Sequence, residues 1–94
     1  MNYQKGERDE DMNDQQARAQ FRRVLNQQIK RTDIKVTTLA KLVGVSNSQV
    51  TRWMQGDLMP DWRQFNRLLD IFNISDEYIL GNSISESTYN KRFK

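Results

Sequence analysis

Few side chains in this sequence are suited to catalysis. Cysteine and histidine are both absent from the 94 residues, which excludes disulfides, thiolate metal sites and an imidazole general base. Carboxylates, hydroxyls and amines remain, and Asp57 and Asp61 come closest to a carboxylate pair. Both have simpler roles, Asp57 in a loop and Asp61 as a helix cap. We therefore expect neither an enzyme nor a bound cofactor or metal.

A second group of polar residues belongs to a short helix that we predict from about Asn47 to Met54. Within it, Val50, Trp53 and Met54 share one apolar face at the spacing i, i+3, i+4. The polar residues left on the outer side are Asn47, Ser48, Thr51, Arg52 and Gln55. They could form a recognition surface, but taken alone they fit an ordinary solvated helix surface better.

The charge of the chain is unevenly distributed. Residues 1–14 contain two basic and five acidic side chains, a net charge of −3. Because the whole chain has a net charge of +3, the remaining 80 residues have a net charge of +6. Because residues 1–13 have almost no apolar side chains, we predict that 1–14 form a flexible acidic arm. The basic body suits a partner with closely spaced phosphates, and it suits a merely solvated surface equally well.

Helical periodicity dominates the rest of the chain, and no convincing strand pattern occurs. A first helix begins at Asn13 or Asp14 and ends near Arg31, with an apolar stripe of Ala17, Phe21, Val24, Leu25 and Ile29. A second helix, of about two turns, contains Leu39, Ala40 and Val43 and stops at Gly44. Ser46 then caps the polar-sided helix from about Asn47 to Met54.

Two further helices complete the predicted fold. Asp61 caps one with the stripe Trp62, Phe65, Leu68, Leu69 and Phe72, and Asn73 ends it. Ser75 caps a last short turn that contains Tyr78, Ile79 and Leu80 and closes at Gly81. We interpret residues 82–94 as a polar C-terminal tail. The prediction is an all-α fold of five short helices around one core, with residues 15–81 as the folded domain.

The segment LAKLVGVSNSQVTRWMQG, Leu39 to Gly56, resembles the helix-turn-helix of the Cro and phage-repressor family, a xenobiotic-response-element-like DNA-binding domain with a lambda-repressor-like fold. Ala40 is small where two helices must cross, Gly44 permits the turn, and Val50 can pack back onto the first helix. Pro60 and the closing pattern LLDIFNISDEYILG extend the match, which covers roughly residues 17–81.

The resemblance implies that the second helix of the motif lies in the major groove of DNA. The matching base-reading positions are Asn47, Ser48 and Arg52, because Arg can pair with guanine and Asn with adenine through two hydrogen bonds. Backbone or secondary contacts would come from Ser46, Gln49, Thr51 and Gln55, together with Thr37 and Thr38 at the start of the first motif helix.

Two positions depart from the family pattern. Val36 replaces a Gln that commonly contacts phosphate, and Asp57 stands where the loop often carries Lys, so Arg63 becomes the candidate replacement contact. Trp53 and Trp62 could stack on bases, but each belongs to an apolar stripe, which favours the core. Arg22, Lys35 and Lys41 are weaker candidates for phosphate contacts.

The resulting expectation is a cytoplasmic transcriptional regulator, a repressor or Cro-like switch protein of a phage or mobile element, with no membrane association. One short helix reads few bases, so we expect a homodimer on a two-fold symmetric DNA operator. Tyr78, Ile79, Tyr89 and Phe93 are candidates for its interface. The alternative is an antitoxin or antirepressor-like interaction module that grips a protein partner through the acidic arm, although a merely solubilising arm is the simpler interpretation of that segment.

Overall fold

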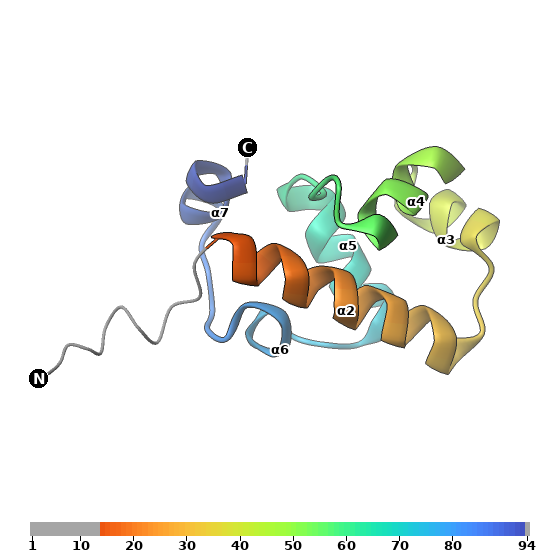
Figure 1. The fold of residues 1–94 in the computed structure, drawn as a ribbon, viewed down its shortest axis with the longest axis horizontal. Coiled ribbons are helices and arrows are strands. Elements are labelled where there is room, and N and C mark those ends of the chain that lie inside the picture. Colours follow the sequence, from red (N-terminus) through yellow and green to blue (C-terminus); the bar gives the residue numbers. More distant parts are fainter. Residues whose placement is uncertain (1–13, 94) are drawn as a thin grey trace, which may run out of the picture.

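The computed structural model describes residues 14–93, which form six helices and no strand (Figure 1). These are α2 (Asp14–Thr32), α3 (Val36–Val43), α4 (Asn47–Gln55), α5 (Trp62–Phe72), α6 (Asp76–Leu80) and α7 (Glu86–Phe93). The predicted all-α class is therefore confirmed. The count of five helices is wrong by one, because α7 forms where a polar tail was expected. The proposed N-cap Asn13 and the arm up to residue 13 lie outside the described residues.

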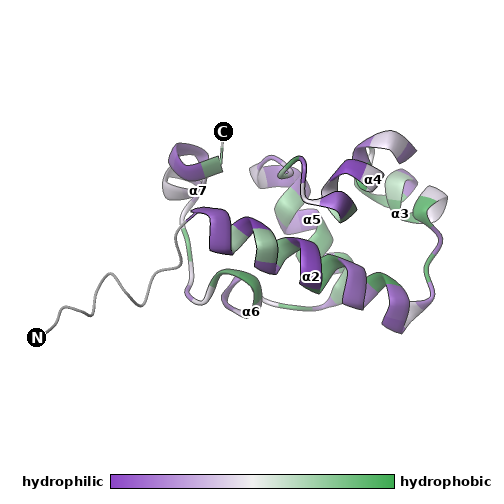
Figure 2. Ribbon diagram, viewed as in Figure 1, coloured by the Kyte–Doolittle hydropathy of each residue, from purple (hydrophilic) through white to green (hydrophobic). Residues whose placement is uncertain are grey.

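One hydrophobic core joins these helices. The longest helix, α2, contacts both α4 and α6, while α3 packs on α4 and α5. In Figure 2 the ribbons of α2 and α5 change repeatedly between hydrophilic and hydrophobic colours, as expected of helices that bury one face. The largest fully buried side chains come from all six helices and one loop: Phe21, Leu39, Val50, Trp53, Pro60, Phe65, Leu80 and Tyr89.

Local capping explains where the middle helices begin. The Ser46 hydroxyl accepts a hydrogen bond from the Gln49 backbone N–H at 3.1 Å, as predicted. At α5, Asp61 accepts from the Gln64 N–H at 2.8 Å and the Gln64 side chain accepts from the Asp61 N–H at 3.0 Å, a complete capping box. Ser75 caps α6 as Ser46 caps α4, because its hydroxyl accepts from the Tyr78 N–H at 3.3 Å. These bonds satisfy N–H groups that the helices leave without internal partners.

The segment after Gly81 is not the polar tail that we predicted. Ser85 caps α7 by accepting from the Thr88 N–H at 3.2 Å, and Tyr89, only 1% exposed, belongs to the core. Its ring lies 4.9 Å from that of Phe65 and 5.5 Å from that of Trp62, centroid to centroid. The prediction failed because a single buried residue, Tyr89, attaches this otherwise polar helix to the core, and the site that receives it is formed by residues distant in the sequence.

Within residues 14–93, no helix has both the length and the apolar character that a bilayer crossing requires.

Candidate nucleic-acid interface

The centre of the candidate site is the pair α3 and α4 with the turn between them. Gly44 ends α3 in the left-handed conformation, with φ 87°, and its N–H donates to the Ala40 carbonyl at 2.8 Å. Ala40 is 2% exposed, and Val50 and Trp53 are completely buried. A small residue at the crossing and a permissive residue at the turn therefore allow α4 to pack against α3, as the sequence predicted.

The side of α4 away from this contact is polar and open to solvent. Of the predicted base readers, Asn47, Ser48 and Arg52 are all exposed, as are Thr51 and Gln55, whereas Gln49 is half-buried. A shallow hollow beside the helix is lined by Ser46, Ser48, Gln49, Arg52 and Leu58. Four of the predicted contact residues thus share one surface, while Asn47, Thr51 and Gln55 do not line the hollow.

Two hydroxyl groups of this surface already have backbone partners. Ser46 accepts from the Gln49 N–H, and the Thr51 hydroxyl donates to the Asn47 carbonyl at 3.0 Å. The Thr51 hydroxyl hydrogen is therefore occupied, which leaves only its lone pairs for a ligand. Arg52, by contrast, is an exposed cation with five N–H donors on a fixed helix.

The candidate phosphate contacts lie on two other helix starts. Thr37 and Thr38 are exposed in the first turn of α3, whose N-cap residue Lys35 provides no side-chain hydrogen bond. The N–H groups of that turn are consequently not capped by a side chain of the preceding residue, a situation that favours an anion. Arg63 is exposed in the first turn of α5.

The C-terminal end of α4 is attached to α2 by two residues that the sequence did not reveal. The Asn26 side-chain N–H₂ donates to the Met54 carbonyl at 2.9 Å and to the Arg22 carbonyl at 2.8 Å. Arg22 lies against Gly56, which ends α4 with φ 81°; a Cβ atom there would come within 2.9 Å of Arg22 Cδ. Both residues are polar positions beside the apolar stripe of α2, and no local pattern identifies their partners.

The C-terminal end of α3 has a comparable attachment. The Arg67 Nε on α5 donates to the Leu42 carbonyl at 3.0 Å. Because the last carbonyls of a helix lack partners within it, a cation in this position satisfies one of them and interacts favourably with the helix dipole. The two motif helices are thus both held from outside the motif, α4 by α2 and α3 by α5.

Trp53 lies in the core, as predicted, whereas Trp62 packs against the core but is only partly buried. Trp53 is completely buried, and its indole N–H has no hydrogen-bond partner within residues 14–93. Trp62 is half-buried, with its ring 6.4 Å from that of Phe65. A fully buried Trp53 offers no face on which a base could stack.

One titratable group near the loop after α4 has a strongly altered pKa. Burial, reinforced by the Asp61 carboxylate, raises the pKa of Tyr89 well above its usual range, and the nearby charge of Arg18 opposes this only partly. The hydroxyl therefore stays protonated and donates to the Pro60 carbonyl at 2.6 Å. This bond links α7 to the residue that precedes the cap of α5.

The fold and the exposed polar helix together define a helix-turn-helix protein. In agreement, a family model described as a helix-turn-helix domain matches residues 20–78, well over half of the chain. The chain belongs to this helix-turn-helix family, whose members are DNA-binding modules and typically not enzymes. No curated protein and no solved structure matches it.

Proposed function

We propose that this protein is a sequence-specific double-stranded DNA-binding regulator of transcription, a repressor or Cro-like switch protein that occupies an operator through α4. The observation that carries this proposal is the division of α4 into two sides. Val50 and Trp53 are completely buried, whereas Asn47, Ser48 and Arg52 project into solvent. A helix held so firmly by one side presents the other in a fixed geometry, which base recognition requires.

The proposed readers have distinct roles. Arg52 can donate two hydrogen bonds to guanine O6 and N7, and Asn47 can pair with adenine N6 and N7. Ser48, within the same hollow as Arg52, can donate to or accept from either type of base. Each good two-point contact contributes about 1–3 kcal/mol of discrimination against the wrong base.

Contacts to the DNA backbone would hold α4 in register with the bases. Thr37 and Thr38 offer hydroxyls at the uncapped start of α3, and Arg63 offers a cation at the start of α5, while Ser46, Gln49, Thr51 and Gln55 surround the readers. Asp57 is exposed immediately after Gly56 and opposes phosphate binding at that point. Arg63, six residues further on, supplies the positive charge that the loop lacks.

Specificity calls for two copies on a symmetric operator, because one short helix reads few bases. The structure narrows the candidate interface: Ile79 is 3% and Tyr89 1% exposed, so these two residues serve the monomer core rather than a dimer contact. Tyr78, 53% exposed on α6, remains available, and Phe93 is half-buried.

The decisive experiment is a selection of bound duplexes from a random DNA pool by the full chain. We expect enrichment of one site made of two inverted half-sites about one helical turn apart. If no sequence is enriched and the folded chain instead retains a protein from its host in a pull-down that depends on residues 1–14, the interaction-module alternative replaces this proposal.

A further inference from the structure

Two arginines on α2 lie on the same flank of that helix. Arg18 and Arg22 are four residues apart, so they are neighbours on the helix surface, with Cβ atoms about 5–6 Å apart. Arg22 is the residue that lies against Gly56 at the end of α4. Arg18 is therefore one turn further from α4, toward the N-terminal end of α2.

Arg18 meets α7 at the ring of Phe93. Its guanidinium carbon lies 5.6 Å from the centroid of that ring, and the guanidinium carbon of Arg92 lies 5.1 Å from the same centroid. The two cations cannot be further apart than the sum of these distances, which is comparable to the screening length of about 8 Å in physiological salt. We call Arg22, Arg18 and Arg92 the arginine row.

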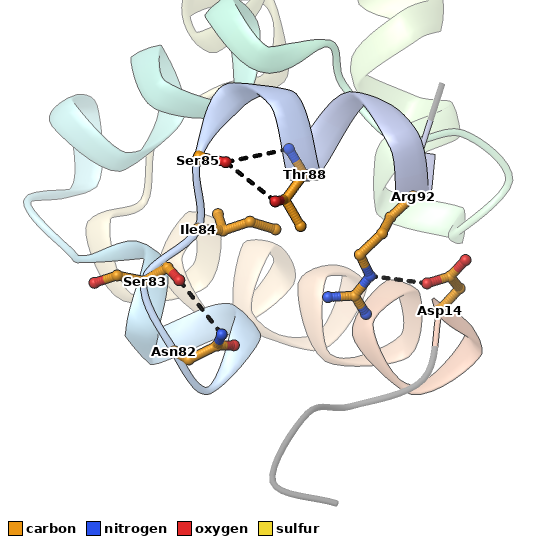
Figure 3. Close-up of a pocket in the computed structure, with 7 residues that line it drawn as sticks. All are labelled: Asp14, Asn82, Ser83, Ile84, Ser85, Thr88 and Arg92. Atoms are coloured by element: carbon orange, nitrogen blue, oxygen red, sulfur yellow. Dashed lines mark hydrogen bonds and ion pairs between the residues drawn. The ribbon is translucent and has the colours of Figure 1, made fainter. Parts of the chain in front are cut away.

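Among the described residues, two carboxylates act on this part of the molecule, Asp14 and Asp61. Asp14 accepts a hydrogen bond from Arg92 Nε at 2.9 Å (Figure 3), and it is a well-exposed carboxylate at the start of α2. The three arginines of the row outnumber these two carboxylates, and because like charges held this close repel one another, a further anion is favoured there.

The arginine row is continuous with the candidate DNA-binding surface. The row begins where Arg22 lies against Gly56, immediately after α4. It then passes the loop 57–61, because Arg18 is close enough to Tyr89 for its charge to act on the pKa of that residue, and the Tyr89 hydroxyl donates to the Pro60 carbonyl in this loop. Figure 1 shows α4, this loop and α7 along one edge of the molecule, with α6 at the opposite edge. Tyr89, in the core, holds α7 firmly in this position.

We infer that the arginine row binds the sugar–phosphate backbone of DNA that flanks the bases read by α4. This inference rests on the proposed function and extends the DNA contact beyond the helix-turn-helix onto α7. A duplex backbone offers closely spaced negative charges to several cations at once, and their binding releases condensed counterions. Continuity with the end of α4 favours this occupant over an acidic protein segment.

The test compares two duplexes that carry the same selected site, one with no flanking base pairs and one flanked on both sides. Wild-type protein should bind the flanked duplex more tightly, and the gain should shrink as salt is raised. Arg18→Gln and Arg22→Gln, which remove charge but keep part of the aliphatic side chain, should each weaken binding to the flanked duplex severalfold. Each should also reduce the slope of log affinity against log salt by about 1.

Arg23→Gln provides the matched control. Arg23 follows Arg22 in the sequence but lies about 100° further round α2, where its guanidinium bonds to the Gln20 side chain. This change should leave the advantage of the flanked duplex intact. Circular dichroism and thermal melting of every variant would show that each is folded at the assay temperature.

Three results would overturn the inference. If the wild type binds both duplexes equally, or if the Arg18 and Arg22 variants keep the full advantage, the arginine row does not contact flanking DNA. If deletion of the acidic residues 1–13 raises affinity for the flanked duplex in the wild type but not in these variants, and the variants bind as well as the deleted chain, the arginine row holds that segment instead. A wild type that binds neither duplex would instead refute the proposed function.

Discussion

The side-chain N–H₂ of Asn26, on α2, donates a hydrogen bond to the Met54 carbonyl in the last turn of α4, across 28 positions of sequence. The same group donates to the Arg22 carbonyl within its own helix. One amide thus satisfies a carbonyl at the end of the proposed recognition helix and fixes that end to the longest helix of the fold. The orientation of α4 consequently depends on a residue outside the helix-turn-helix.

Replacement of Asn26 by Leu should weaken both stability and DNA binding. Loss of the bond to Met54 should cost about 0.5–1.5 kcal/mol of unfolding free energy, measured by urea denaturation. Binding to the selected duplex should fall as well, because the end of α4 is no longer held. Gln27→Leu, at an exposed neighbouring position, is the control. Equal effects of the two substitutions would show that the bond to Met54 has no specific role.

Arg52 and Val50 separate base reading from packing within one helix. Arg52→Ala should relax preference at one base position by about 1–3 kcal/mol while the melting temperature stays nearly unchanged. Val50→Ala should cost roughly 2 kcal/mol of stability, since it removes methyl groups from a completely buried site. Thermal melting and binding to selected and scrambled duplexes measure both. Equal loss on the two duplexes would identify Arg52 as a phosphate contact instead.

The two glycines that end α3 and α4 should respond differently to alanine. Both have left-handed backbone angles, φ 87° at Gly44 and φ 81° at Gly56, so each substitution should cost roughly 1–2 kcal/mol in backbone strain. A Cβ at Gly44 meets nothing within 4 Å, whereas at Gly56 it would approach Arg22 Cδ to 2.9 Å. Gly56→Ala should therefore be the more destabilising in denaturant titrations.

A double variant isolates the steric part of that difference. Arg22→Ala removes the atom that the new Cβ would meet, so Gly56→Ala should cost less in the Arg22→Ala background than in the wild type. Additive effects on the free energy of unfolding would mean that Arg22 moves aside freely.

Tyr89 should make stability fall at alkaline pH. Its pKa is raised in the folded chain, mainly by burial, so above the ordinary tyrosine value of about 10 the unfolded state loses a proton that the folded state keeps. The contribution is thus fully present below pH of about 10 and is lost as pH rises further, by up to about 1.4 kcal/mol per unit. Tyr89→Phe should abolish this part of the slope in urea titrations.

Tyr78, which is well exposed on α6, offers the matched comparison. Tyr78→Phe should leave the alkaline slope of stability as it is in the wild type. An unchanged slope in Tyr89→Phe would show that the buried hydroxyl is not the group that titrates.

The features decided by neighbouring residues were predictable from the sequence. Ser46, Asp61 and Ser75 cap helices through N–H groups only three positions away, and the buried stripes follow from a period of 3.6 residues. The same periodicity identified the outer side of α4, including Asn47, Ser48 and Arg52. Their roles in binding DNA remain predictions.

Contacts between distant segments were decided only by the tertiary structure. The sequence of α7 is mostly polar, and Tyr89 is buried because Pro60, Trp62 and Phe65 surround a site that no neighbour of Tyr89 indicates. Likewise, Asn26 meets Met54, and Arg18 meets Phe93, across more than 25 positions. Periodicity shows which side of a helix is apolar, but partners across the core depend on how the helices pack together.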